Sequence, residues 1–112
     1  MLPKAHRLPS FEIRKVLFGG KRIAAEGISI TIRKNSLPLS RFTVSVPLKA
    51  AKRATRRNRT KRLIRESIRH LLGKIMPGYD GVIIVMRDLF GQKQSQVEEL
   101  VKRMFEKIRL VA

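Results

Sequence analysis

The 112-residue sequence contains no cysteine and no tryptophan, and only eight of its side chains are acidic. Without cysteine, the chain cannot form disulfides, thiolate zinc sites or a cysteine nucleophile. Its longest apolar run, residues 82–86, is far shorter than the roughly 20 residues that cross a bilayer. The N-terminal residues lack the continuous apolar segment of a secretory signal. The sequence therefore predicts a cytoplasmic protein with no membrane partner.

Motifs of a self-contained enzyme are missing as well. The chain has neither a GxxxxGK[ST] phosphate loop nor a GxGxxG sequence. Its carboxylates are dispersed, without the cluster that holds two metal ions in a nuclease, although residues distant in sequence can still converge in space. We interpret both histidines, His6 and His70, as RNA contacts or surface groups rather than general bases. Neither a catalytic apparatus nor a metal site is expected in this chain alone.

Positive charge, in contrast, is abundant. The chain has 26 Lys and Arg residues against eight acids, which gives a formal net charge of +18. Hydrophobic residues make up 43% of the chain, enough for an ordinary core, so the charge does not indicate a disordered tail. Self-repulsion of this size opposes compaction and is explained if the protein works beside a polyanion. Nucleic acid is the first candidate; an anionic membrane surface is the second and is not the partner that we expect.

The first half of the chain predicts one short helix and two strands. Residues 11–18 follow Ser10, a suitable N-cap, and precede two glycines; Ile13, Val16 and Leu17 share one apolar face. Residues 27–33 and 41–46 alternate between apolar and small polar side chains, as strands with one buried face do. We expect residues 34–40 to form a hairpin loop between them. The hydroxyl-bearing face is then either plain surface or the floor of a groove.

Residues 49–69 contain ten Lys and Arg residues against one acid, Glu66. Their second half is periodic, because Ile64, Ile68 and Leu71 fall at helical spacing and continue to Ile75. The pattern predicts a helix that is both docked and basic, begins near residues 53–55 and ends before Pro77. Several of these charges lie at the helix N-terminus, which the helix dipole disfavours and a bound polyanion would relieve.

The remaining residues complete the predicted fold. Residues 81–87 form an apolar, β-branched run that indicates a central strand buried on both faces. Residues 95–98 have a capping-box pattern that opens a last helix. Its predicted core stripe consists of Val97, Leu100, Val101, Met104, Phe105 and Ile108. The fold class is therefore α+β: one domain over residues 1–112, a sandwich of a small sheet and helices in the order α-β-β-α-β-α.

Within the basic helix, residue types suit a folded RNA. Arginine presents a planar fork to phosphate oxygens, and lysine offers a mobile point charge. Asn58 differs because its amide both donates and accepts hydrogen bonds, so it can meet a base edge or a 2′-hydroxyl.

Residues 54–66, ATRRNRTKRLIRE, closely resemble the signature of the bacterial ribonuclease P protein component. The predicted element order supports the resemblance over nearly the whole chain. It implies a ribosomal protein S5 domain 2-like fold with a left-handed crossover. It also implies the small subunit of a ribonucleoprotein that removes the 5′ leader from precursor tRNA, with the active site and Mg²⁺ in the ribonuclease P RNA. One protein per RNA is expected.

The resemblance also implies two binding surfaces. The basic helix would lie against the RNA subunit, through the motif residues and their basic neighbours: Arg53, Arg56, Arg57, Asn58, Arg59, Lys61, Arg62, Arg65 and Arg69. A cleft between the first helix and the sheet would hold the single-stranded leader, through Ile13, Leu17, Ser29, Thr31 and Ser45. The family usually has aromatic residues where this chain has Ile13 and Leu17; a rotated helix would present Phe11 or Phe18 instead.

Three functions compete at this point. The first is the protein cofactor of an RNA enzyme, the second is a ribosomal or general RNA-binding protein, and the third is a nuclease active by itself. Stimulation of a ribonuclease P RNA separates the first from the second, and RNA cleavage without an RNA subunit identifies the third.

Overall fold

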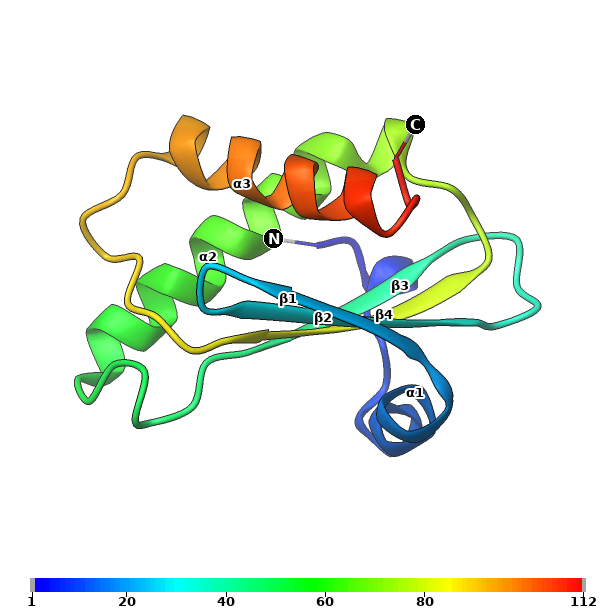
Figure 1. The fold of residues 1–112 in the computed structure, drawn as a ribbon, viewed down its shortest axis with the longest axis horizontal. Coiled ribbons are helices and arrows are strands. Elements are labelled where there is room, and N and C mark those ends of the chain that lie inside the picture. Colours follow the sequence, from blue (N-terminus) through cyan, green and yellow to red (C-terminus); the bar gives the residue numbers. More distant parts are fainter. Residues whose placement is uncertain (1, 112) are drawn as a thin grey trace.

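The computed structural model describes residues 2–111 and has a single sheet with helices on both faces (Figure 1). Across the sheet the strands run β1 (Lys21–Ala25), β2 (Ile28–Lys34), β4 (Tyr79–Val85) and β3 (Arg41–Ser45). The helices α2 (Ala54–Leu71) and α3 (Gln94–Lys107) cover one face, and the short α1 (Ile13–Gly19) lies on the other. The predicted fold class, an α+β sandwich with a small sheet, is confirmed.

Strand β4 is central, pairing antiparallel with β2 and parallel with β3. The prediction that residues 34–40 form a hairpin loop is therefore wrong, because β4 lies between the two strands that this loop connects. Alternation within each strand says which face is buried but not which strand is its neighbour. The hairpin that does form joins β1 to β2 through Glu26 and Gly27, whose φ angles of 52° and 78° are both positive.

Strand β1 was not predicted from the sequence. It is an edge strand whose first residues, Lys21 and Arg22, are exposed, and only Ile23 and Ala25 pack against the core. Exposed basic side chains are typical of sheet edges, where they oppose pairing with another chain. A segment with so little apolar alternation carries too weak a signal to be recognised as a strand.

The core lies between the inner face of the sheet and the two long helices. All six apolar side chains predicted for this face are buried: Ile28, Ile30, Ile32, Phe42, Val44 and Val46. The predicted stripe of α3 is buried throughout, and the ring of Phe105 stacks on Phe42 with 5.6 Å between centroids. The predicted apolar face of α2 is also confirmed, since Ile64, Ile68 and Leu71 are buried.

The helix ends agree with the sequence at α2 but not at α1 or α3. Helix α2 begins at Ala54 as predicted and continues into a 3₁₀ turn, Leu72–Lys74. A 3₁₀ turn, Ser10–Glu12, precedes α1, and Ser10 makes no capping hydrogen bond. Helix α3 begins at Gln94, where the N–H of Lys93 donates to Gln96 Oε1 over 2.9 Å, so residues 95–98 are not its capping box.

The outer face of the sheet is built from three rows of side chains that run across β2, β4 and β3. Register places Arg33, Asp80 and Arg41 in one row, Thr31, Val82 and Thr43 in the next, and Ser29, Ile84 and Ser45 in the third. Helix α1 packs on this face through Val16, which is buried with Leu8 and Val82. A Cβ on Gly20 would come within 2.7 Å of the Thr31 side chain, so the chain leaves α1 directly over the middle row.

No helix within residues 2–111 is long and apolar enough to cross a membrane.

Candidate nucleic-acid interface

Helix α2 is held to the body of the protein by buried polar contacts as well as by its apolar face. The hydroxyl of Thr60 accepts a hydrogen bond from the N–H of Leu89 over 3.1 Å. The amide of Gln94 donates to the Leu63 carbonyl and to the Ser67 hydroxyl, both over 2.9 Å. These contacts fix the rotation of α2, so its opposite surface faces solvent in a defined way.

Five predicted RNA-binding residues lie on this solvent-facing surface or beside it without a partner inside the protein. Within residues 2–111, no side-chain hydrogen bond or ion pair involves Asn58, Arg59, Lys61, Arg62 or Arg65. Arg53, which precedes the helix, is also exposed. We call these six residues the open basic surface. A concentration of cations without internal counter-charges is the electrostatic footprint of a polyanion-binding surface.

Arg56 and Arg57, also predicted to bind RNA, make bonds within the protein. The guanidinium of Arg56 pairs with Asp88 and lies 4.4 Å from the centre of the Phe90 ring. This pairing, together with the N–H of Phe90, lowers the pKa of Asp88 below its ordinary value. Arg57 donates to the carbonyls of Ala51 and Lys52 over 3.0 and 2.8 Å, which fixes the turn before α2.

At the other end of α2, the last predicted RNA-binding residue belongs to an ion-pair network with α3. Arg69 donates to Glu66 over 2.9 Å, and this guanidinium lowers the pKa of Glu66 to about 2. His70 Nδ1 lies 2.6 Å from Glu98. His70 is an exposed surface group, as predicted, whereas His6 Nδ1 donates to the Ser40 carbonyl over 2.7 Å and ties the N-terminal segment to the sheet.

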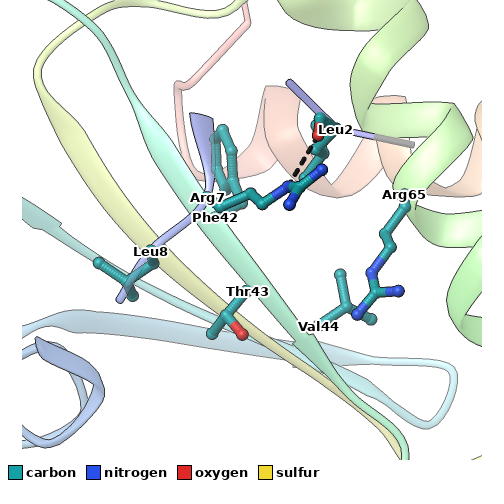
Figure 2. Close-up of a pocket in the computed structure, with 7 residues that line it drawn as sticks. All are labelled: Leu2, Arg7, Leu8, Phe42, Thr43, Val44 and Arg65. Carbon is teal, nitrogen blue, oxygen red and sulfur yellow. Dashed lines mark hydrogen bonds between the residues drawn. The ribbon is translucent and has the colours of Figure 1, made fainter. Parts of the chain in front are cut away.

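Arg65 turns away from its neighbours on α2 and lines a pocket at the edge of β3 (Figure 2). Its guanidinium lies beside Val44, and Arg7 approaches from the N-terminal segment, where its Nε donates to the Leu2 carbonyl over 2.9 Å. Among the described residues, no acidic side chain lines this pocket. Sequence reasoning did not select Arg7 as a site residue, because a single arginine before Leu8 carries no periodic signal.

The three predicted cleft residues of the sheet differ in position. Ser29 and Ser45 belong to the third row, whereas Thr31 belongs to the middle row, on which α1 packs. Ser45 is exposed, and Ser29 is half-buried in a shallow pocket with Ala24 and Met86. Thr31 is only 2% exposed, so its predicted place on the open cleft surface is wrong. The Thr31 side chain is on the outer face of the sheet, as predicted, but the turn at Gly20 between α1 and β1 covers it.

The sheet-facing side of α1 carries Ile13, Val16 and Leu17, so the helix is not rotated to present a phenylalanine. Ile13 packs against the small buried cluster around Val16, while Leu17 is 43% exposed and stays the predicted wall of the leader cleft. Phe18, on α1, and Phe11, in the 3₁₀ turn before it, are 88% and 75% exposed. The wall of the cleft is therefore aliphatic.

The row of Arg33, Asp80 and Arg41 contains a buried ion pair and borders a pocket beside α1. Asp80, 4% exposed, accepts bonds from Arg41 over 2.8 and 2.7 Å and from the Asn35 amide over 2.8 Å. The bond to Asp80 raises the pKa of Arg41. These bonds join β2, β4 and β3 across the sheet and stabilise their register.

Among the described residues, no group of three or more His, Asp or Glu side chains could hold a metal ion.

Known proteins match this arrangement over most of the chain. The family model described as Ribonuclease P matches residues 2–109. The ribonuclease P protein component of Microcystis aeruginosa is 38% identical over 89 residues, covering 75% of this chain and 74% of that protein. That of Synechococcus elongatus is 30% identical over 112 residues, covering 91% and 92%.

Solved structures agree in fold. The RNase P protein from Thermotoga maritima superposes with a TM-score of 0.79 at 29% identity, covering 90% of this chain and 96% of that one. The Staphylococcus aureus RNase P protein gives a TM-score of 0.84 at 20% identity, covering 97% and 100%. The match across residues 2–109 covers the helix that carries both the open basic surface and the sequence signature, and the chain belongs to the bacterial ribonuclease P protein family, a tRNA-processing family.

Proposed function

We propose that this chain is the protein subunit of ribonuclease P, which binds the catalytic RNA and the 5′ leader of precursor tRNA and assists Mg²⁺-dependent removal of that leader. The observation that carries the proposal is the open basic surface: six polar or cationic side chains, presented by a rigidly docked helix, that lack partners within residues 2–111. It rests also on membership of the family.

In this proposal the open basic surface binds the ribonuclease P RNA. Arg59 and Arg62 contact phosphates, and the release of condensed counterions supplies most of the affinity. Asn58 contributes a directional hydrogen bond to a base edge or a 2′-hydroxyl. Arg56, Arg57 and Arg69 act indirectly, because their bonds to Asp88, to the turn carbonyls and to Glu66 keep α2 and its flanking loop in place.

The third row of the outer face receives the leader. Ser29 and Ser45 lie on either side of Ile84, opposite it in register on β2 and β3. Neighbouring strands are about 4.8 Å apart, so the two hydroxyls are separated by roughly 10 Å. This surface offers hydroxyl groups to sugars and phosphates and aliphatic carbon to bases, with Leu17 as its predicted wall. It recognises a single strand without strong selection among bases.

Catalysis is assigned to the RNA subunit, which holds the Mg²⁺ in this proposal, with one protein per RNA. The protein alone is then inactive and contributes by binding and orienting precursor tRNA. Cytoplasmic function follows from the substrate class.

The test is cleavage of a precursor tRNA by the matched ribonuclease P RNA at low Mg²⁺, with and without this protein. We expect stimulation of cleavage at the leader junction, and none by the protein without RNA. No stimulation, together with binding to ribosomal RNA, would identify a general RNA-binding protein. Cleavage by the protein alone would identify a self-sufficient nuclease.

A further inference from the structure

The solvent-facing side of α1 and of the 3₁₀ turn before it carries two exposed rings that the fold does not explain. At 88% and 75% exposed, Phe18 and Phe11 are the most exposed large hydrophobic residues in the part of the chain that the structure describes. Neither ring gains the stabilisation that burial brings to an apolar side chain. Since the sheet-facing side of the same helix is occupied by Val16 and Ile13, the rings cannot be placed in the core by a small rotation.

The spacing of the rings places them on one line with two cations between them. Phe11 and Phe18 are seven residues apart, which is about two helical turns and roughly 10 Å along the axis. Arg14 and Lys15, three and four residues after Phe11, flank the line between the rings and are exposed; Lys15 also lines the pocket that contains Arg41 and Asp80. We call these four residues the ring–cation stripe.

We propose that the ring–cation stripe binds single-stranded RNA, with bases stacked on Phe11 and Phe18 and phosphates paired with Arg14 and Lys15. Exposed aromatic rings combined with cations are the arrangement by which proteins bind single strands without sequence preference. At about 3.4 Å per stacked nucleotide, the separation of the rings spans roughly three nucleotides. This site is distinct from the outer face of the sheet and does not depend on the proposed role in ribonuclease P.

The charge of the stripe and the packing of the apolar face of α1 favour RNA over a partner protein or a membrane. A partner protein would have to bury Arg14, and the stripe has no acid of its own to neutralise it; Glu12 and Lys15 both line the pocket that contains Arg41 and Asp80. Binding flat to a membrane requires a continuous apolar face, and the apolar face of α1 is already packed on the sheet. RNA supplies both the anions and the flat apolar partners that the stripe requires.

The two surfaces flank α1. Leu17, the predicted wall of the leader cleft, and Phe18 are consecutive residues, so their side chains leave the axis about 100° apart on a helix that is about 10 Å in diameter. One strand can therefore contact both surfaces only with different nucleotides.

A single tryptophan at position 18 tests the proposal, because the chain has no other tryptophan and Phe18 is exposed. The full-length Phe18→Trp variant is titrated with a 12-nucleotide single-stranded RNA, a duplex of the same length and inorganic polyphosphate. We expect the single strand to quench the tryptophan fluorescence and the other two to leave it nearly unchanged. Adding Phe11→Ser should raise the RNA concentration at half-quenching on the order of fivefold or more, by the loss of one stacked base.

A Met76→Trp variant, exposed and far from α1 in sequence, serves as the matched control and should respond weakly to all three ligands. The proposal is wrong if the fluorescence of the Phe18→Trp variant stays unquenched while the RNA is fully bound, because the strand then binds only elsewhere. It is also wrong if polyphosphate or duplex quenches as strongly as the single strand, since charge alone then explains the response. A blue shift with phosphatidylglycerol vesicles, without quenching by RNA, would overturn it by assigning the stripe to a membrane surface.

Discussion

Arg41 and Arg62 belong to two regions in which the same side chain has opposite roles. Arg41 lies on the outer face of the sheet and gives both ends of its guanidinium to Asp80, which is nearly buried. Arg62 lies on the exposed side of α2 and has no partner among the described residues. The comparison shows that basic residues in this chain divide into those that hold the fold and those that are open to a ligand, and that only their surroundings separate the two groups.

The largest expected effect is the loss of stability when the ion pair between Arg41 and Asp80 is broken. Arg41→Ala leaves Asp80 buried and unpaired, which costs about 3–5 kcal/mol of unfolding free energy. The change is measured by urea denaturation, with Arg62→Ala as the matched control, which should stay within about 0.5 kcal/mol of the wild type. Similar losses for both variants would show that the two arginines do not differ in role.

Helix α1 allows the same comparison between neighbouring apolar residues, since Val16 is buried and Leu17 is 43% exposed. Leu17→Phe would add a ring on the predicted wall of the leader cleft. Stacking on a ring is worth roughly 1–3 kcal/mol per base, so precursor tRNA should bind the reconstituted enzyme about 5-fold to 150-fold more tightly. Mature tRNA has no leader and should bind unchanged.

The measurement is the affinity of both tRNA species at fixed Mg²⁺ and salt. Leu48→Phe, which places a ring on the exposed turn before α2, is the control and should alter neither affinity. Equal tightening for precursor and mature tRNA, or a change confined to stability, would place Leu17 outside the leader site.

The buried face of these elements could be predicted from the sequence, because it follows from the periodicity of their apolar residues. Alternation identified the buried face of β2 and β3, and helical spacing identified the buried sides of α2 and α3 together with the start of α2. These patterns report how each element faces the core, which is a local property of the chain. The signature in residues 54–66 likewise identified the family.

What could not be predicted depends on long-range pairing. Nothing within residues 27–46 indicates that β4 separates the two strands, and nothing around Arg56 indicates that Asp88, 32 residues later, binds it. Thr31 has the alternation of an exposed residue and is buried only because the turn at Gly20 crosses it. The candidate RNA-binding set therefore included arginines that are used inside the protein.

Within the open basic surface, the salt dependence of RNA affinity should distinguish charged contacts from the hydrogen bond of Asn58. With around six phosphate contacts, the logarithm of affinity for the ribonuclease P RNA should fall against the logarithm of salt with a slope of roughly −4 to −5. Arg62→Ala should make this slope shallower by about one. Asn58→Ala should cost about 1 kcal/mol of binding without changing the slope, because a neutral amide releases no counterion.

Filter binding over a range of salt concentrations gives both quantities, and Lys107→Ala, on α3, is the control for a cation outside the surface. An equal change of slope for Arg62→Ala and Asn58→Ala would remove the separate role of Asn58. A wild-type slope near −1 would show that α2 is not the main phosphate contact.

The smallest expected effect concerns the ion pair of Glu66 with Arg69, which is partly exposed and so intermediate between the two regions. The pKa of Glu66 is lowered from 4.5 to about 2 in the folded protein, chiefly by its bond to Arg69. A carboxyl whose folded pKa is depressed stabilises the protein above its unfolded pKa and loses that contribution as the pH falls through the folded value. As the pH is lowered from 4.5 to 2, the Glu66→Gln variant should therefore lose less thermal stability than the wild type. Glu99→Gln, an exposed residue of α3 outside the described ion pairs, should leave the loss unchanged. If Glu66→Gln and the wild type lose the same stability over this range, the pair contributes nothing to folding and Arg69 belongs with the arginines that are open to RNA.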